Sequence, residues 1–344
     1  MILDREYPDI TEQPKVTIAI PTYNRAAFLT EALDSALAQT YKNIEVIVSD
    51  NASTDNTLQL LENYTDDRLT IIQQKTNLGM VGNWNACLEK ASGEFFILLS
   101  DDDFLDPTAI EKMANIFRYG TPNFDLGKIG MVYCKSRIVD DKGAIIGYGK
   151  HGAEVESASL IVKQFFRCKR SIYPCCVMMR TSDIQSLGGY DGLQYPLAAD
   201  ANAWMAIAIK RGNVACIDEV LTNYRVHTSN VTSEVGIGEW ITNNSNLAKM
   251  SIGKFLDQGD LRSARSIERL IHKFNADAIS GLILRSAEGV GARFTFVRQH
   301  FVYTEYFFSL HGFLLLFRAI IKIYLPKTIL NKIRKARRAM ISHS

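Results

Sequence analysis

The sequence lacks any paired-cysteine motif. Its six cysteines include no Cys-x-x-Cys pair, and Cys175 and Cys176 are adjacent within an apolar run. This pattern favours reduced core thiols, and it argues against both a disulfide framework and a cysteine-based zinc site.

Long hydrophobic runs are also missing. No apolar stretch reaches the ~18–20 residues that a membrane-spanning helix needs, and the longest candidate, 313–317, is followed at once by Arg318. The first 15 residues carry more acidic than basic side chains and have no apolar signal-peptide core. We therefore expect a cytoplasmic protein that is not integral to a membrane.

Acidic residues are absent after Glu305, where the chain becomes basic. The eight cationic side chains of this tail are Arg318, Lys322, Lys327, Lys332, Arg334, Lys335, Arg337 and Arg338. The first 305 residues carry 31 basic and 37 acidic groups, a net charge of −6, which argues against nucleic acid as a partner. After Pro326 the tail can form a basic amphipathic helix, which suits the anionic inner face of the cell membrane. A helical cap with a solvated basic end is the other interpretation of the tail.

The first third of the chain alternates apolar runs with amphipathic segments. Strands are predicted at 16–20, 43–50, 69–74 and 94–100, with helices between them. Near-continuous apolar strands are typical of a parallel sheet covered on both faces, in which ligands bind beyond the carboxyl ends of the strands. Three polar groups fall at those ends, and they are Thr22 to Arg25, Asp50 to Asp55, and Asp101 to Asp103.

The second part of the chain has a different spacing. It predicts a strand–turn–strand over 128–149, helices over 157–167 and 201–212, and strands over 175–180, 213–217 and 220–227. From about Glu239 onward the pattern is mostly helical. The predicted organisation is one domain over 1–238, with halves at about 15–120 and 121–238, and a helical C-terminal extension over 239–344.

The stretch "FILLSDDDFLDP" places three adjacent carboxylates directly after a buried strand. Such carboxylates repel one another unless a positive group lies among them, and Mg²⁺ or Mn²⁺ favours carboxylate and phosphate oxygens. The alternative is a solvated loop whose aspartates only cap the next helix. Asp106, before Pro107, is the predicted cap.

Several segments in order resemble a known family. They are "VTIAIPTYNRAAFLTEALDSALAQTYKNIEVIVSDNASTDNT", "NLGMVGNWNACLEKASGEFFILLSDDDFLDP", "GGYD", "AADANAWMAIAIKRG" and "YRVHTSN". Over residues 15–232 the chain resembles the family 2 glycosyltransferases, inverting enzymes of the bacterial polysaccharide type with the GT-A fold. The resemblance implies an α/β fold with a Rossmann-like mixed sheet flanked by helices.

The resemblance also implies a nucleotide-sugar site. Its residues are Pro21, Thr22, Tyr23, Asn24, Arg25, Asp50, Asn77, Gly79, Asn83, Asp101 and Asp102. Within this set, Asp50 would accept a hydrogen bond from the pyrimidine ring. The chain departs from the family pattern at Ser100, where an aspartate is usual, and at Trp84, where many relatives carry arginine.

A divalent cation, Mn²⁺ or Mg²⁺, is the cofactor that the resemblance implies. Its ligands would be Asp102, Asp103 and His227, with a diphosphate contact as the alternative role of His227. Arg225 would either bind diphosphate or be a surface strand residue.

The catalytic base implied by the resemblance is Asp200. Relatives carry a Glu-Asp pair here, and Ala199 replaces its first member. The alternative role of Asp200 is to cap the helix that follows. Relatives place an aromatic residue near the position of Trp204 to pack under the sugar. A buried helix tryptophan more often belongs to the hydrophobic core, which is the role expected for Trp204.

These features together predict metal-dependent, inverting transfer of a sugar from a UDP- or dTDP-sugar to a saccharide or lipid-linked acceptor. The product would be a surface polysaccharide or glycolipid. A nucleotidyltransferase and a non-catalytic nucleotide-sugar-binding protein are the alternatives.

Overall fold

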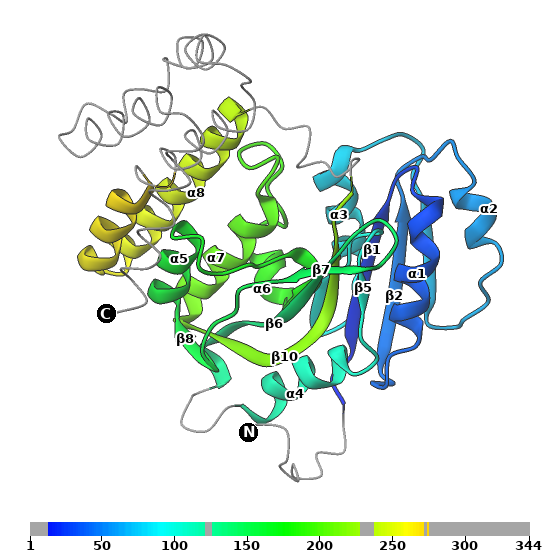
Figure 1. Cartoon of the computed structure of the whole chain (residues 1–344), viewed down its shortest axis with the longest axis horizontal. Coiled ribbons are helices and arrows are strands. Elements are labelled where there is room, and N and C mark those ends of the chain that lie inside the picture. The colour runs from blue at the N-terminus through cyan, green and yellow to red at the C-terminus, as the bar shows by residue number, and fades with distance from the viewer. Residues whose placement is uncertain (1–12, 121–125, 228–236, 272–273, 275–344) are drawn as a thin grey trace, which may run out of the picture.

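The computed structural model describes residues 13–120, 126–227, 237–271 and 274 (Figure 1). The strands are β1 (Val16–Thr22), β2 (Ile44–Asp50), β3 (Leu69–Gln73), β4 (Phe95–Leu98), β5 (Phe104–Leu105), β6 (Ile129–Val139), β7 (Ile145–Tyr148), β8 (Val155–Ser157), β9 (Val177–Arg180) and β10 (Asn213–Arg225). The helices are α1 (Ala26–Leu37), α2 (Thr57–Leu61), α3 (Gly79–Lys90), α4 (Ala109–Tyr119), α5 (Ala158–Phe166), α6 (Thr181–Ser186), α7 (Ala199–Arg211) and α8 (Ile237–Asp257). Two short 3-10 helices are η1 (Leu126–Lys128) and η2 (Pro174–Cys176).

The described strands form one sheet in the order β3-β2-β1-β4-β9-β6-β10-β5, with β7 beside β6 and β8 beside β10. Neighbours from β3 to β4 are parallel, whereas β9 is antiparallel to both β4 and β6. The predicted mixed sheet flanked by helices is confirmed. Right-handed crossovers place α1 and α2 on one face and α3 on the other.

The parallel half brings strand ends to one edge, as its sequence pattern predicts. Thr22 at the end of β1 is the register partner of Asp50 at the end of β2. Helix α1 covers these strands with Leu29, Ala32 and Leu33, which are fully buried and have helical spacing. The loops that follow β1, β2 and β4 therefore share one rim of the sheet.

β10 differs from the prediction, because the two strands expected at 213–217 and 220–227 are one strand. Its pairing with β6 shifts register between Ile217 and Val220. The two acidic residues at this irregularity are held by lysines, Asp218 by Lys135 and Glu219 by Lys112. The irregularity lets the strand carry these two acidic side chains without ending.

Helix α8 packs on α7 and opens the predicted C-terminal extension. Asn243 accepts a hydrogen bond from Leu197 N at 3.2 Å, and Gln258 donates to Ile209 O at 2.7 Å. No helix in the described part is long and apolar enough to cross a bilayer. The predicted basic amphipathic tail lies outside the described residues, and the boundary at 238/239 stays a prediction.

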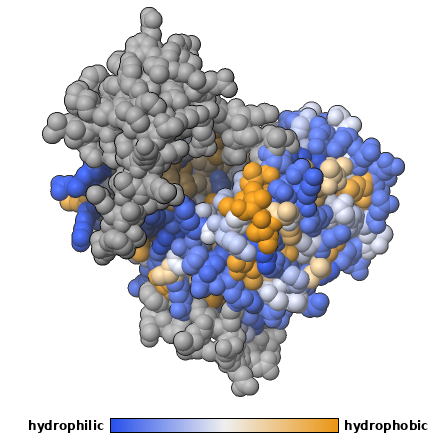
Figure 2. Space-filling model, viewed as in Figure 1, coloured by the Kyte–Doolittle hydropathy of each residue, from blue (hydrophilic) through white to orange (hydrophobic). Residues whose placement is uncertain are grey.

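One face of the molecule exposes apolar side chains around β7. Ile145, Ile146 and Tyr148 are 53%, 60% and 61% exposed, and Figure 2 shows hydrophobic surface gathered on the face that carries this strand. The turn that leads into β7 approaches Arg225, whose Nη1 lies 3.9 Å from a Cβ built at Gly143.

Candidate active site

The loops after β1 and β2 are tied together by side-chain hydrogen bonds. Asn24 adopts a left-handed conformation (φ 53°), and its Oδ1 accepts from Thr54 N at 2.7 Å. Asp50 is fully buried, and its Oδ1 accepts from Ser53 N at 3.2 Å. Tyr23 is 42% exposed at the rim. This region thus offers a buried carboxylate on β2 and an exposed aromatic side chain after β1.

Asn77 and Gly79 shape the neighbouring loop. Asn77 Oδ1 accepts from Asn51 Nδ2 at 2.9 Å and from Gly79 N at 2.8 Å. Gly79 has φ 75°, a conformation that favours glycine. Both residues therefore fix the loop that borders Asp50.

Asn83 lies beneath the strand ends rather than on the rim. It is 2% exposed, accepts from Ser49 Oγ at 2.6 Å and donates to Ser49 O at 2.8 Å. Its amide joins α3 to the end of β2, which makes it an internal support of the predicted nucleotide site.

The aspartates after β4 have different partners but still affect one another's charge. Asp102 Oδ2 lies 2.9 Å from His227 Nε2, whereas Asp103 Oδ1 accepts from Arg225 N at 2.9 Å. Burial and the Asp102 charge raise the pKa of Asp101 to about 7. Burial, with a smaller effect of Asp102, also raises the pKa of Asp103 well above its usual value.

Arg25 joins Asp102 and His227 in a compact cluster. Its Nη1 lies 3.0 Å from His227 Nε2 and 3.6 Å from Asp102 Oδ2. The side chains of Asp102 and His227 are 11% and 4% exposed, and the Phe28 ring stacks on the imidazole at 4.8 Å. We call Arg25, Asp102 and His227 the polar cluster.

The polar cluster supplies two of the three predicted metal ligands. Asp102 and His227 converge, but Asp103 is turned inward, and the described residues hold no group of three or more metal-ligating side chains. Carboxylate and imidazole both suit Mn²⁺, and a cation that takes its remaining ligands from diphosphate and water fits this pair. The guanidinium of Arg25 now lies against both groups, so a bound cation requires it to move.

Arg225 is buried, so the prediction of a surface strand residue is wrong. It is 3% exposed. Its Nε donates to Asp102 O at 2.9 Å, and its Nη1 donates to Asp140 O and Asp141 O at 3.2 Å each. Arg225 also pairs with Glu31 of α1. It therefore connects residues 101–103, which we call the acidic segment, with α1 and the β6–β7 turn.

Asp106 is not the cap of the next helix, contrary to the prediction. The residue that precedes α4 is Thr108, and the Asp106 carboxylate instead binds Arg137 Nη1 at 2.8 Å and Asn223 Nδ2 at 3.1 Å. The Asp106 carboxylate is held by Arg137 of β6 and Asn223 of β10, so it is turned away from the start of α4.

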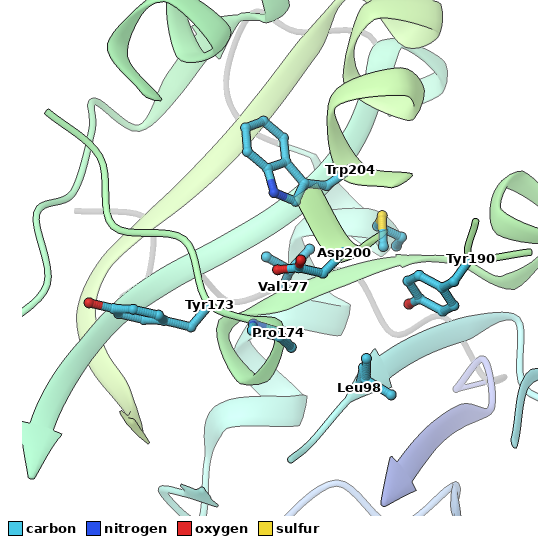
Figure 3. Close-up of a pocket in the computed structure, with 8 residues that line it drawn as sticks. Leu98, Tyr173, Pro174, Val177, Tyr190, Asp200 and Trp204 are labelled. Carbon is cyan, nitrogen blue, oxygen red and sulfur yellow. The ribbon is translucent and has the colours of Figure 1, made fainter. Parts of the chain in front are cut away.

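Asp200 lies in the wall of a cavity between α7 and β9 (Figure 3). The other residues lining it are Leu98, Tyr173, Pro174, Val177, Met179, Tyr190 and Trp204. Burial raises the pKa of Asp200 to about 6, although backbone N–H groups at the start of α7 act in the opposite direction. An apolar setting disfavours the charged carboxylate and makes it a better proton acceptor near neutral pH.

The cap interpretation of Asp200 is wrong, since α7 begins at Ala199. The cap position is Ala198, which makes no side-chain hydrogen bond to the helix, and Asp200 lies in the first turn. Its carboxylate is therefore placed by the helix and faces the cavity (Figure 3).

The Gly-Gly loop before α7 is held by Asn85. Tyr190 N donates to Asn85 Oδ1 at 2.8 Å, and Asn85 Nδ2 donates to Tyr190 O at 2.9 Å. Tyr190 also meets Trp84 edge to face at 5.5 Å. Trp84 thus supports the wall of the Asp200 cavity.

Trp204 lies in the hydrophobic core, as the sequence predicts, and it also lines the cavity. The signal that places it beside Asp200 is the four-residue spacing on one helix. The sequence reasoning missed two other cavity residues. Tyr173 and Tyr190 come from loops, and no spacing in the sequence indicates that they meet there.

Comparison with known proteins identifies the family of the chain. The model of glycosyl transferase family 2 matches residues 17–181. An uncharacterized glycosyltransferase of Rickettsia typhi is 31% identical over 224 residues, which are 65% of this chain and 67% of that protein.

Two solved structures share the fold at 19% sequence identity. S. aureus TarS 1–349 in complex with UDP-GlcNAc has a TM-score of 0.62, and the match covers 94% of this chain and 92% of that one. The mannosyltransferase PcManGT from Pyrobaculum calidifontis, in complex with GDP-Man and Mn²⁺, has a TM-score of 0.53 with coverages of 92% and 89%. The predicted GT-A fold is confirmed. The chain belongs to glycosyl transferase family 2 and is therefore a glycosyltransferase, rather than a nucleotidyltransferase or a non-catalytic binding protein.

Proposed function

We propose that this glycosyltransferase moves a sugar from a nucleoside-diphosphate sugar to a saccharide or lipid-linked acceptor, with inversion at the anomeric carbon. The observation that carries the proposal is the position of Asp200. It is the one carboxylate among the residues lining the cavity, and its pKa is raised to about 6.

Asp200 acts as the general base in this proposal. Its carboxylate takes the proton of an acceptor hydroxyl, the hydroxyl oxygen bonds to the anomeric carbon, and the bond to the nucleoside diphosphate breaks. Direct displacement of this kind inverts the anomeric centre. General-base assistance contributes about 10²–10⁴-fold to the rate.

The donor would bind along the rim formed by β1 and β2. The nucleotide contacts proposed there are Pro21, Thr22, Tyr23, Asn24, Arg25, Asp50 and Asp101, with Asn77, Gly79 and Asn83 shaping the site from behind. Asp50 is an acceptor-only group at the strand end, which suits the imide N–H of uracil or thymine. A UDP- or dTDP-sugar is therefore the proposed donor, and the UDP-GlcNAc complex of TarS supports this class.

Asp102 and His227 are the proposed protein ligands of Mn²⁺ or Mg²⁺. A divalent cation bound there would stabilise the charge of the departing diphosphate as a Lewis acid. Arg25 would leave the pair when the cation binds and would be free to contact the donor. Asp103, which binds Arg225 N, would hold the acidic segment in place.

A donor screen tests the proposal. Thermal unfolding is followed with UDP-, dTDP- and GDP-sugars, each with Mn²⁺ or with EDTA. We expect stabilisation by a uridine or thymidine donor with Mn²⁺, because ligands that bind the folded state raise the unfolding temperature. Preference for GDP-sugars would contradict the assignment of Asp50, and equal stabilisation in EDTA would contradict the metal site.

We also propose that the basic tail contacts an anionic membrane, where a lipid-linked acceptor would lie. Each cation near such a surface contributes about 1 kcal/mol. Liposome co-sedimentation of the full chain and of a chain ending at residue 312 tests this proposal. Equal binding of the two to anionic vesicles would contradict it, because the truncation removes all eight cations of the tail.

A further inference from the structure

The cavity that contains Asp200 also contains an unused hydrogen-bond donor. Trp204 is 1% exposed, and its Nε1–H has no hydrogen-bond partner among the described residues. A buried indole N–H normally finds a partner, and leaving one unpaired is unfavourable because the group has lost its water without gaining a hydrogen bond. The nitrogen edge of the ring faces the side on which Asp200 lies (Figure 3).

The remaining walls of the cavity are apolar or aromatic. Leu98, Val177 and Met179 are buried strand residues, and Tyr173 and Tyr190 lie on either side of Asp200 (Figure 3). The cavity thus combines one unpaired N–H donor, one carboxylate, two tyrosines and apolar side chains. A lone water could bond the N–H and the carboxylate, but it would leave the apolar side chains without contacts.

An N-acyl group matches the N–H donor, the carboxylate and the apolar side chains. Its carbonyl oxygen accepts a hydrogen bond, its N–H donates one, and its methyl group is apolar. A carboxylate has two oxygens, so Asp200 can accept the amide N–H on one and the attacking hydroxyl on the other. A plain hydroxyl substituent would satisfy the indole N–H but would leave the hydrocarbon walls unfilled.

We propose that the Trp204–Asp200 cavity binds the N-acyl group of a 2-acetamido sugar, and that Trp204 Nε1–H donates to the acyl carbonyl. Trp204 is then a specificity-determining residue, and the assignment rests on the proposed role of the cavity in sugar transfer. The acetamido sugar is either the acceptor or the donor, and both present the same group.

Binding can be measured without turnover. The methyl glycoside of N-trifluoroacetylglucosamine is titrated into the full chain, and its ¹⁹F line width is recorded. We expect broadening with the unaltered chain and at least about tenfold weaker broadening with Trp204→Phe, which keeps an aromatic ring and removes the donor. Trp240→Phe is the matched control, because Trp240 stacks on Phe274 at 5.0 Å and is not among the cavity residues.

A second variant guards against a folding defect. Val177→Ile adds one methyl to the cavity wall and keeps a β-branched strand residue, and it should also weaken the broadening severalfold. Equal broadening by the unaltered chain, Trp204→Phe and Val177→Ile, or none by the unaltered chain, would overturn the assignment.

Turnover then separates the two sources of the acyl group. Paired acceptors and paired donors that differ only in acetamido against hydroxyl are compared by kcat/KM. We expect Trp204→Phe to lower kcat/KM for the acetamido member of one pair by at least about tenfold more than for its hydroxyl partner. Loss of discrimination in the acceptor pair identifies the acceptor, and loss in the donor pair identifies the donor.

The proposed function and this inference fail in different ways. If no pair supports transfer but the unaltered chain still broadens the ¹⁹F line, the proposed function is contradicted and the acyl-binding site is supported. Transfer without any acetamido preference, or with an unchanged preference in Trp204→Phe, contradicts the acyl site alone.

Discussion

The polar cluster and the Asp200 cavity hold their carboxylates in opposite ways. Asp102 lies within 4 Å of both an arginine and a histidine. Asp200 shares its cavity with hydrocarbon, aromatic rings and an unpaired indole N–H. Asp102 lies in the loop after β4, where Arg25 and His227 are its neighbours, whereas Asp200 lies in the first turn of α7.

This contrast indicates two different tasks. A carboxylate beside an imidazole offers the oxygen and nitrogen ligands that suit a divalent cation such as Mn²⁺. An apolar setting favours the neutral form and brings the pKa near the working pH, which suits a group that takes and returns a proton. The comparison predicts that substitutions on the two sides will affect different kinetic quantities.

The largest effect is expected for Asp200→Asn. The variant keeps the shape of the cavity and removes the base, so kcat should fall about 10²–10⁴-fold while donor affinity is retained. Steady-state kinetics and donor titration by calorimetry check this together. Asp67→Asn, at an exposed position before β3, is the control for loss of a carboxylate. Full activity in Asp200→Asn would show that Asp200 is not the general base.

A smaller effect is expected for Asp102→Asn in the polar cluster. The pair with His227 loses its charge, so the Mn²⁺ concentration that gives half-maximal activity should rise at least about tenfold. Activity measured against Mn²⁺ concentration, at saturating donor, is the readout. An unchanged Mn²⁺ dependence would show that the polar cluster is not the metal site.

Arg225→Gln should lower the stability of the whole fold. It removes donors to the carbonyl groups of Asp102, Asp140 and Asp141, and each buried group left unpaired costs about 1–3 kcal/mol. We expect the free energy of unfolding to fall by about 2–4 kcal/mol, as measured by urea denaturation. A change within experimental error would mean that Arg225 does not hold the acidic segment.

The smallest effect is expected for Gly189→Ala, a change beside the wall of the Asp200 cavity. Gly189 has φ 87°, and an added Cβ would lie 2.5 Å from Asn85 Oδ1. Gly188→Ala is matched to it, because Gly188 has φ 82° but no atom within 4 Å of an added Cβ. The left-handed strain of about 1–2 kcal/mol should appear in both variants.

The difference between the two glycine variants measures the contact with Asn85. Only Gly189→Ala should also lower kcat, because the shift of Asn85 would move Tyr190 in the cavity wall. Equal loss of kcat in both variants would show that loop strain, rather than the Asn85 contact, controls the cavity.

The sequence predicted the elements that hydrophobic periodicity controls. The apolar runs that became β1, β2 and β4 and the buried face of α1 follow from side-chain spacing, and so does the shared edge of the strands. The mixed sheet and the GT-A fold came from the resemblance, because antiparallel pairing of β9 is a long-range contact that local spacing does not encode.

Side-chain direction was the part that the sequence could not predict. Adjacent residues in a tight loop can point anywhere, so Asp102 and Asp103 were grouped as ligands although Asp103 points toward Arg225. Asp106 was taken for a helix cap because its partner Arg137 lies 31 residues away in the sequence. The contacts of Arg225 and the aromatic cavity walls likewise depend on loops that meet only in the folded chain.

Whether Asp200 is the general base can be read from its titration. Carboxyl ¹³C resonances of the full chain, labelled at aspartate, are followed from pH 4 to pH 8, with Asp200→Asn used to assign the resonance. We expect a pKa of about 6 for Asp200 and an acid limb of kcat/KM at the same pH, because the base must be deprotonated to act. An Asp200 pKa near its usual value of about 3.9, with an acid limb that does not follow it, would show that Asp200 is not the base.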